Sequence, residues 1–238
     1  MIQSSLAIAA ASSPEAVSTP PHILLSALAF LGLGVLLVVA AVVAAGLAGF
    51  GKRRAARSVA AAAAGAVLFY AVVLFAAAWA SRDRTLGPGG RKYFCELDCH
   101  LAYSLEPAAA SGTGGRAVVV VRTWFDPATT SAWRGDTALT PNPRVAWIVD
   151  AAGRRYLPLP PTAGAGPDSG VAAFDRPLRP GESSQTTLSF DLPGGVRGPR
   201  LYVGDRGMPG PLLIGHENSP GHGKIYFALG SPAPGRHG

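Results

Sequence analysis

The chain has 238 residues, 48% of them hydrophobic and 15% charged, with a formal net charge of +7. That length accommodates one medium-sized domain, or a small domain with an additional element. Residues 81–238 carry 17 of the 21 basic side chains and 13 of the 14 acidic ones. Charge scattered in this way, without a Lys/Arg run or interleaved aromatic residues, is typical of a solvated surface, so we expect no nucleic-acid partner.

Two long uncharged segments occupy the first third of the chain, before the composition changes near residue 81. Ile23–Phe50 and Val59–Ala80 contain no charged residue, and each exceeds the roughly 20 residues that cross a hydrocarbon core of about 30 Å. A signal peptide has an apolar region of only about 7–15 residues, and residues 1–22 lack the Lys or Arg of such a signal. We therefore expect a hairpin of two transmembrane helices in residues 23–80, preceded by a disordered tail of residues 1–22.

A basic loop, residues 51–58, separates the two apolar segments. Its four positive charges are those of Lys52, Arg53, Arg54 and Arg57. The positive-inside rule places this loop in the cytoplasm and the rest of the chain outside. Basic residues also follow the second segment, but long domains cross the membrane largely regardless of charge. We expect a two-pass cell-membrane protein whose lipid partner is the bilayer and whose C-terminal domain is extracytoplasmic.

The C-terminal region begins with a linker, residues 81–91, and continues with a stretch, residues 92–230, that Gly and Pro interrupt at short intervals. That rhythm is typical of an all-β sandwich, and residues 231–238 are expected to be a disordered tail. The Val-rich segment 116–125 and the alternating segment 186–192 carry the clearest strand patterns. Further strands are expected at residues 144–149, 154–157, 200–203, 212–214 and 225–229.

Two turns are specified by their own residues. Asp150-Ala-Ala-Gly153 connects two apolar runs, which predicts a hairpin. Pro180-Gly181 suits the middle of a type II turn just before the alternating strand.

The informative segments of the C-terminal region are Lys92–Tyr103, Leu139–Arg144, Asp150–Tyr156, Leu178–Glu182, Phe190–Pro193 and Glu217–Pro220 with His222. In these segments the chain resembles bacterial extracytoplasmic immunoglobulin-like domains of unknown function that are anchored to the membrane. The resemblance implies a sandwich fold and a role in binding or assembly, and it implies no reaction. The double membrane span differs from the single anchor expected of such domains.

Both cysteines lie in one short segment, Cys95-Glu-Leu-Asp-Cys99-His100. In an extended strand their Cα atoms would be about 13 Å apart, too far for a disulfide, which needs about 4.4–6.8 Å. A helical turn or tight loop brings the same spacing to about 6 Å. We therefore expect a turn or bulge here, with a regular strand beginning near Leu101.

Several interpretations of Cys95, Cys99 and His100 stay open. The first is a structural disulfide with no cofactor, since the expected compartment is oxidising. The second is a copper or zinc site, because these metals take thiolate and imidazole ligands. The third is c-type haem, whose usual attachment motif is one residue shorter. Two ordinary thiols are the fourth.

A second polar cluster comprises Met208, His216, Glu217 and His222. Asn, Ser, Pro and Gly between its histidines are ordinary turn formers, which favours a solvated surface turn. Alternatively, the loop folds toward the cysteines and supplies further metal or haem ligands.

Catalytic templates fail on inspection of the sequence. His216-Glu217 is followed at the zinc-protease position by Pro220, which would interrupt the required helix. The dispersed Asp and Glu residues suggest no pair for acid–base chemistry. We expect a non-enzymatic envelope module for binding or assembly, with the lipid bilayer as its partner and another envelope protein as a further candidate partner. The alternative is a membrane-tethered metal-handling or redox domain.

Overall fold

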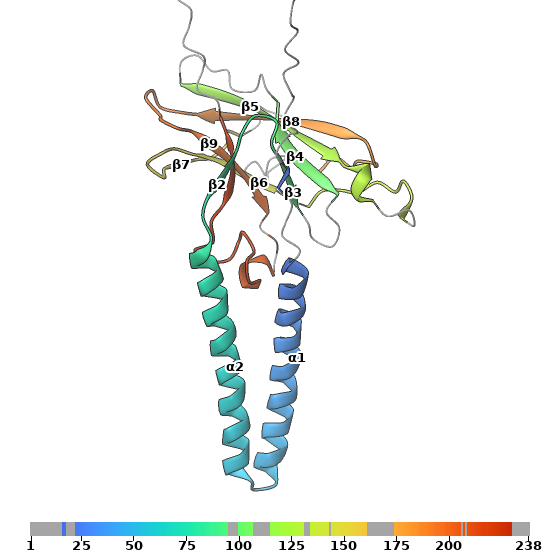
Figure 1. Ribbon diagram of the computed structural model, residues 1–238, viewed down its shortest axis with the longest axis vertical. Coiled ribbons are helices and arrows are strands. Elements are labelled where there is room, and N and C mark those ends of the chain that lie inside the picture. Colours follow the sequence, from blue (N-terminus) through green and yellow to red (C-terminus); the bar gives the residue numbers. More distant parts are fainter. Residues whose placement is uncertain are drawn as a thin grey trace, which may run out of the picture.

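The computed structural model describes residues 16–17, 22–94, 100–106, 115–130, 134–142, 144–160, 174–205, 207 and 209–229. Two long antiparallel helices carry, at one end, two packed β-sheets (Figure 1). The end of the hairpin where the helices meet the sheets is called the outer end below. The predicted architecture of two apolar helices followed by a β-sandwich is confirmed.

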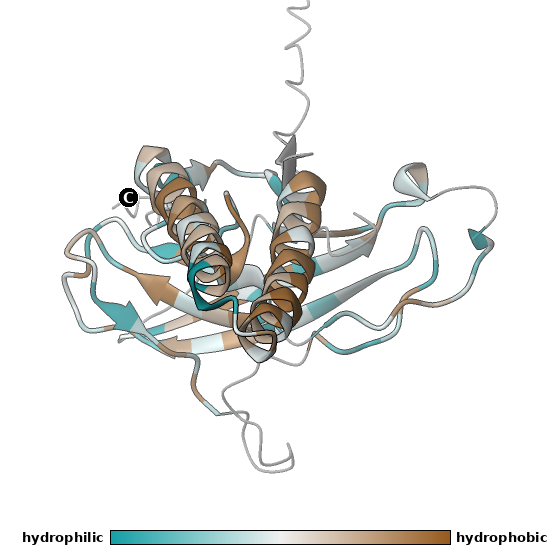
Figure 2. Ribbon diagram, turned by 90° about the horizontal axis from the view of Figure 1, so that it is seen from below, coloured by the Kyte–Doolittle hydropathy of each residue, from teal (hydrophilic) through white to brown (hydrophobic). Residues whose placement is uncertain are grey.

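The helices are α1 (His22–Gly49) and α2 (Arg53–Ala80). Both are long and apolar enough to cross a membrane. Many of their large apolar side chains are exposed. Figure 2 colours both helices as mainly hydrophobic and the turn that joins them as hydrophilic. Such exposed apolar surface needs a lipid or protein environment.

The basic loop is shorter than predicted, because α2 begins at Arg53 and so includes three of the four basic residues. Arg and Ala are good helix formers, so the sequence Arg53–Arg57 continues the helix toward the turn. Gly51 has a φ of +76°, a conformation that glycine adopts readily, and the chain reverses there.

The strands form two five-stranded sheets. Sheet A has the order β1 (Ala16–Val17), β3 (Arg91–Phe94), β4 (Leu101–Leu105), β5 (Arg116–Phe125) and β8 (Ser183–Asp191). Sheet B has the order β2 (Arg84–Leu86), β10 (Ile225–Ala228), β9 (Arg200–Asp205), β6 (Arg144–Val149) and β7 (Arg155–Tyr156). Neighbouring strands are antiparallel except for the pairs β1–β3 and β2–β10.

The strands with the clearest sequence patterns are confirmed. β5 and β6 have the predicted bounds, and β4 begins at Leu101. The Asp150 carboxylate accepts hydrogen bonds from the backbone N–H of Ala152 and Arg154, which holds the predicted hairpin turn. Gly181 has a φ of +87° within a turn closed by the Glu182 N–H and the Arg179 carbonyl, as a type II turn requires.

Strands are present in two regions that were predicted as a disordered tail and a linker. Ala16 and Val17, expected in a disordered tail, pair with Arg91 and Lys92. Residues 84–86, expected in a linker, pair with residues 225–227 of β10. In both cases a short segment occupies a sheet edge whose backbone groups would otherwise be unpaired, a tertiary effect that local composition does not reveal.

The strand predicted at residues 212–214 is wrong. A 3-10 helix, η3 (Gly210–Leu212), lies there. Pro209 and Pro211 have no backbone N–H and fixed φ angles, which disfavour a sheet strand and suit a tight turn. The expected tail 231–238 lies outside the described residues.

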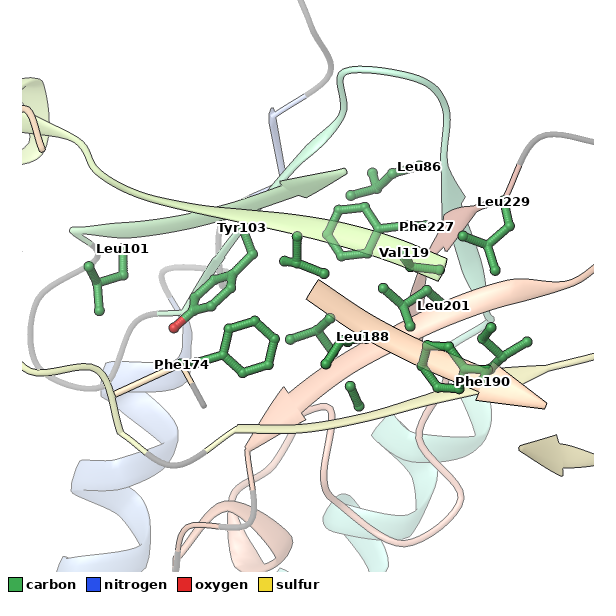
Figure 3. Packing of buried hydrophobic residues seen from close by; sticks show 14 of the residues in the cluster. Leu86, Leu101, Tyr103, Val119, Phe174, Leu188, Phe190, Leu201, Phe227 and Leu229 are labelled. Atoms are coloured by element: carbon green, nitrogen blue, oxygen red, sulfur yellow. The ribbon is translucent and has the colours of Figure 1, made fainter. Parts of the chain in front are cut away.

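The main core lies between the two sheets. Figure 3 shows side chains from both sheets meeting there, among them Phe190 of sheet A and Phe227 of sheet B. Phe174, which precedes β8, completes the cluster by packing edge-to-face on Tyr103. The alternation of buried and exposed residues along β8 places Leu188 and Phe190 in this core.

Candidate functional site

The outer face of sheet B, opposite the main core, is itself covered. A second cluster lies there, formed by Val145, Val149, Tyr202 and Tyr226 with Trp147 packed against them. The Trp147 and Tyr202 rings stack with centroids 4.2 Å apart. The loop between β9 and β10, residues 209–224, is called the helix-side loop; Figure 1 shows it between the sandwich and the outer ends of both helices.

The centre of this region is a buried ion pair. Lys92 of β3 and Glu217 of the helix-side loop are joined by Nζ–Oε distances of 2.7 and 2.9 Å, and the Lys92 side chain is only 3% exposed. Lys92 Nζ also donates to the Val203 carbonyl at 2.7 Å and lies 3.4 Å from that of Ile225. The β9–β10 pairing ends at Tyr202 and Tyr226, so Val203 and Ile225 are the next residue along each strand. The ammonium group therefore joins sheet A, sheet B and the helix-side loop.

Glu217 has a second structural role in the loop. Its Oε1 accepts a hydrogen bond of 2.9 Å from the Ile225 N–H, at the first residue of β10. Lys224 Nζ donates to the Glu217 backbone carbonyl. One acidic residue thus fixes both the start of a strand and the position of a buried cation.

A second buried cation, Arg144, extends from sheet B toward sheet A, whereas Lys92 extends from sheet A toward sheet B. Arg144 of β6 donates from Nε to the Tyr103 hydroxyl at 3.2 Å, and its Nη1 lies 3.7 Å from the Asp205 carboxylate. The Phe94 ring contacts both cations, with Arg144 Cζ at 4.2 Å and Lys92 Nζ at 4.8 Å from its centroid. Buried charges are retained only when they are paired and hydrogen-bonded, as both are here.

His216 and Asn218 close the helix-side loop against β9. The Asn218 side-chain amide donates to the backbone carbonyl and the carboxylate of Asp205. The backbone N–H of Asn218 donates to His216 Nδ1 at 3.0 Å. Gly210 lies against the His216 ring, where an added Cβ would come within 2.8 Å of Cε1. His216 is therefore packed into the loop and accepts a hydrogen bond in its unprotonated form.

The environment of this region shifts several pKa values. Burial lowers the pKa of Lys92, an effect that the neighbouring Glu217 opposes. Burial also lowers the pKa of His216 and of Lys224, and it raises that of the Tyr202 hydroxyl. No described nucleophile is paired here with a base, and the contacts link structural elements to one another.

The helix-side loop also contacts the outer end of α2. The Gly223 N–H donates to Ser81 Oγ at 2.7 Å, and the Lys224 N–H donates to Asp83 Oδ1 at 2.9 Å. A Cβ on Gly223 would lie 2.3 Å from the Arg82 backbone carbon, so only glycine fits at this approach. The loop is thus attached directly to the chain that leaves the second helix.

The sequence-predicted site residues fall into two separate places. His100 is buried beside β5, where its ring stacks on Phe125 and Nδ1 lies 2.9 Å from Thr129 Oγ1. Glu217 instead pairs with Lys92, and His222 Nδ1 lies 2.7 Å from the Gly223 carbonyl. Across the described part of the chain, no group of three or more His, Asp or Glu residues is arranged to hold a metal.

Cys95, Cys99 and Met208 lie outside the described residues. Phe94 and Leu101, the described residues nearest the cysteines in β3 and β4, face each other in the antiparallel β3–β4 pair. The metal, haem and disulfide hypotheses stay predictions. Visible absorption, bound-metal analysis and a thiol assay on the purified protein separate them, because a Soret or thiolate–copper band would be absent from a disulfide-bonded protein.

Sequence analysis missed Lys92 and Arg144 as functional residues. The available signal was the charge at the start of each strand, from Arg91 and Lys92 before Tyr93 and from Arg144 before Val145. Such residues also occur at solvated strand ends, so only the tertiary structure distinguishes them. Glu217 was predicted only as a further metal or haem ligand, whereas in the structure its carboxylate pairs with the Lys92 ammonium group.

Comparison with known proteins identifies no family. No family model matches this chain, and no curated protein is similar to it. Among solved structures, the chain is similar to MPT63, a secreted protein from Mycobacterium tuberculosis whose crystal structure was determined at 1.5 Å resolution. The two share 15% sequence identity over 63% of this chain and 99% of that chain, with a TM-score of 0.36.

Proposed function

We propose that this protein is a non-enzymatic binding or assembly module of the bacterial envelope, in which two membrane-spanning helices hold an immunoglobulin-like sandwich outside the cytoplasm. The observation that carries the proposal is the attachment of the sandwich to both helices. β1, which precedes α1, pairs in sheet A, and β2, which follows α2, pairs in sheet B. The helix-side loop adds a third connection.

These connections favour display of the domain in one orientation. Sheet B faces the helices through the helix-side loop, and β5 and β8 of sheet A lie on the far side of the sandwich (Figure 1). A domain on a flexible linker would sample many orientations and would lose more entropy on binding a partner. Fixed attachment is therefore suited to assembly with another component of the same membrane.

The outer face of sheet A has the composition of a binding surface. Trp124 and Arg122 of β5 lie opposite Ser183 and Gln185 of β8. The Arg91 guanidinium lies 4.7 Å from the centre of the Trp124 ring. Trp and Arg are enriched among the residues that dominate protein–protein affinity, especially when a polar rim surrounds them. We propose another envelope protein as the partner of this face.

Location is tested with reporter fusions to the C-terminus of the full chain. An alkaline phosphatase fusion should be active and a green fluorescent protein fusion dark if the sandwich is extracytoplasmic. The matched control is a chain in which Lys52, Arg53, Arg54 and Arg57 are replaced by Asn, which should lose orientation preference. Active cytoplasmic reporters on the unmodified chain would overturn the proposed location.

Binding is tested in intact cells by photo-crosslinking. A photoreactive p-benzoylphenylalanine at Gln185 should give one discrete adduct with another envelope protein, and Trp124→Ala in the same chain should abolish it. The same photoreactive residue at Leu157, which is exposed beyond β7, is the control. Equal adducts at both positions, or adducts insensitive to Trp124→Ala, would contradict a specific partner on sheet A.

A further inference from the structure

We propose that residues Pro209–Gly215, called the apolar turn, enter the outer edge of the bilayer's hydrocarbon core beside α2. The helix-side loop would then be a third membrane contact, with lipid acyl chains as its partner. This inference rests on the proposed membrane location of the two helices. It adds that the domain itself, and not only its anchor, touches lipid.

The position of the apolar turn follows from one hydrogen bond to α2. The Tyr70 hydroxyl donates to the Leu212 carbonyl at 2.7 Å. Tyr70 precedes Ala80, the last residue of α2, by ten residues, which corresponds to about 15 Å along the helix axis. A tyrosine side chain extended fully toward that end spans less than half of this distance. The Leu212 carbonyl therefore lies at least about one helical turn, or about 5 Å, below Ala80.

The length of the apolar segment sets where the membrane must end. Val59–Ala80 has 22 residues, barely more than the roughly 20 that a bilayer core of about 30 Å requires. The hydrocarbon must therefore extend almost to Ala80. Trp79, which is 90% exposed, is placed where interfacial aromatic residues usually lie. Leu212, at least a turn further in, reaches the edge of the hydrocarbon.

Within the apolar turn, the backbone N–H groups of residues 209–213 are suited to a dry environment. Pro209 and Pro211 have no N–H to satisfy. The N–H groups of Gly210, Leu212 and Leu213 donate locally, to the carbonyls of residues 207, 209 and 210. The carbonyl of Leu212 accepts from Tyr70, and that of Leu213 accepts from the buried Ser219 hydroxyl. Irregular backbone at membrane depth must be satisfied in this way, because lipid offers no hydrogen bonds.

The two leucines of the turn point in different directions. Leu213 is buried against the rest of the protein, whereas Leu212 is 39% exposed. An exposed leucine beside α2 and below its outer end continues the apolar surface of the helices. Continuity with that surface identifies acyl chains as the contact of Leu212, since each apolar side chain removed from water is stabilising.

Photo-crosslinking to lipid tests the inference. The full-length protein is placed in vesicles of phosphatidylethanolamine and phosphatidylglycerol with radiolabelled acyl chains. The residue p-benzoylphenylalanine replaces Leu212, Val38 of α1, or Leu157 in separate preparations. Val38 is 66% exposed in the middle of a helix, and Leu157 is 69% exposed on the sandwich. Circular dichroism melting of each variant confirms that it is folded before irradiation.

The expected result is lipid labelling at Val38 and Leu212, several-fold above that at Leu157. Leu157 is more exposed than Leu212, so labelling that depended on exposure alone would be stronger at Leu157. Labelling at Val38 without labelling at Leu212 would overturn the apolar-turn proposal and leave the helix assignment intact. Absence of label at Val38 would overturn the membrane-spanning proposal itself, and equal labelling at Leu212 and Leu157 would overturn a specific membrane contact.

Discussion

The two sheets of the sandwich have the same number of strands but opposite relations to their surroundings. In sheet A, β8 alternates between buried and exposed residues, so one face meets the core and the other meets solvent. In sheet B, β6 and β9 are buried on both faces. The difference arises because the helix-side loop and its ion pair cover the outer face of sheet B. We infer that sheet B serves attachment and sheet A serves recognition.

The largest expected effect on stability comes from neutralising the Glu217 carboxylate, which pairs with Lys92 and holds the helix-side loop over sheet B. Glu217→Gln leaves the Lys92 ammonium buried without a counter-charge, and we expect unfolding to be easier by about 3–5 kcal/mol. The control is Asp136→Asn, which breaks an exposed pair with Arg179 and should cost less than about 1 kcal/mol. Denaturant melts of the full chain in detergent micelles measure both.

A double variant distinguishes loss of charge balance from loss of packing. Adding Lys92→Met to Glu217→Gln removes the orphaned cation, and stability should recover substantially. If the double variant is as unstable as the sum of the single variants, the two side chains act independently and the ion pair does not secure the loop.

The next largest effect is expected at the contact between the helix-side loop and α2. Gly223→Ala places a Cβ against the Arg82 backbone, and overpacking of this kind costs about 1–3 kcal/mol. Gly207→Ala is the matched control, because an added Cβ there meets nothing within 4 Å. Hydrogen exchange should accelerate at residues 219–224 in the first variant only. Equal exchange in both variants would show that the close approach to α2 is not required.

A smaller effect is expected from Tyr70→Phe, which deletes the hydrogen bond to the Leu212 carbonyl. Loss of one such bond costs about 0.5–1.5 kcal/mol. The loss of stability should be greater in a bilayer than in detergent micelles, because water that reaches the loop in a micelle can donate to the Leu212 carbonyl in place of Tyr70. Proteolysis within residues 209–216 reports the local opening. Unchanged proteolysis in bilayer vesicles would count against a role for Tyr70 in holding the apolar turn.

The smallest expected effect is a pH dependence centred on His216. Burial lowers the pKa of His216 in the folded protein below its unfolded value of about 6.5. As the pH falls below 6.5, the unfolded chain therefore binds a proton at His216 more readily than the folded chain does. Stability contributed by the neutral ring is complete above that pH and falls as the pH decreases through it. Asp205 and Glu217 favour protonation, whereas His222 and Lys224 oppose it.

Protonation would also abolish the hydrogen bond that His216 Nδ1 accepts from the Asn218 N–H. The measurement is a series of thermal melts between pH 5 and 8, buffered at constant ionic strength. His216→Gln should flatten the profile, since the amide does not titrate. An unchanged slope in this variant would assign the pH dependence to another group.

The sequence was sufficient for features that depend on local pattern. Val-rich β5, alternating β8 and the Asp150 and Gly181 turns were predicted because their residues satisfy local rules of periodicity and turn chemistry. β1 and β2 were missed because each is a short segment that becomes a strand only when a distant edge strand is beside it. The Lys92–Glu217 pair was missed for the same reason, since 125 residues separate its members.

The pairing of β2 with β10 has a consequence for how the protein is made. β2 emerges directly after the second helix, yet its partner begins at Ile225, close to the end of the chain. During folding this edge segment stays unpaired until residues 225–227 are available to pair with it. A chain truncated anywhere before residue 225 would therefore expose the unpaired β2 segment to proteases and to aggregation.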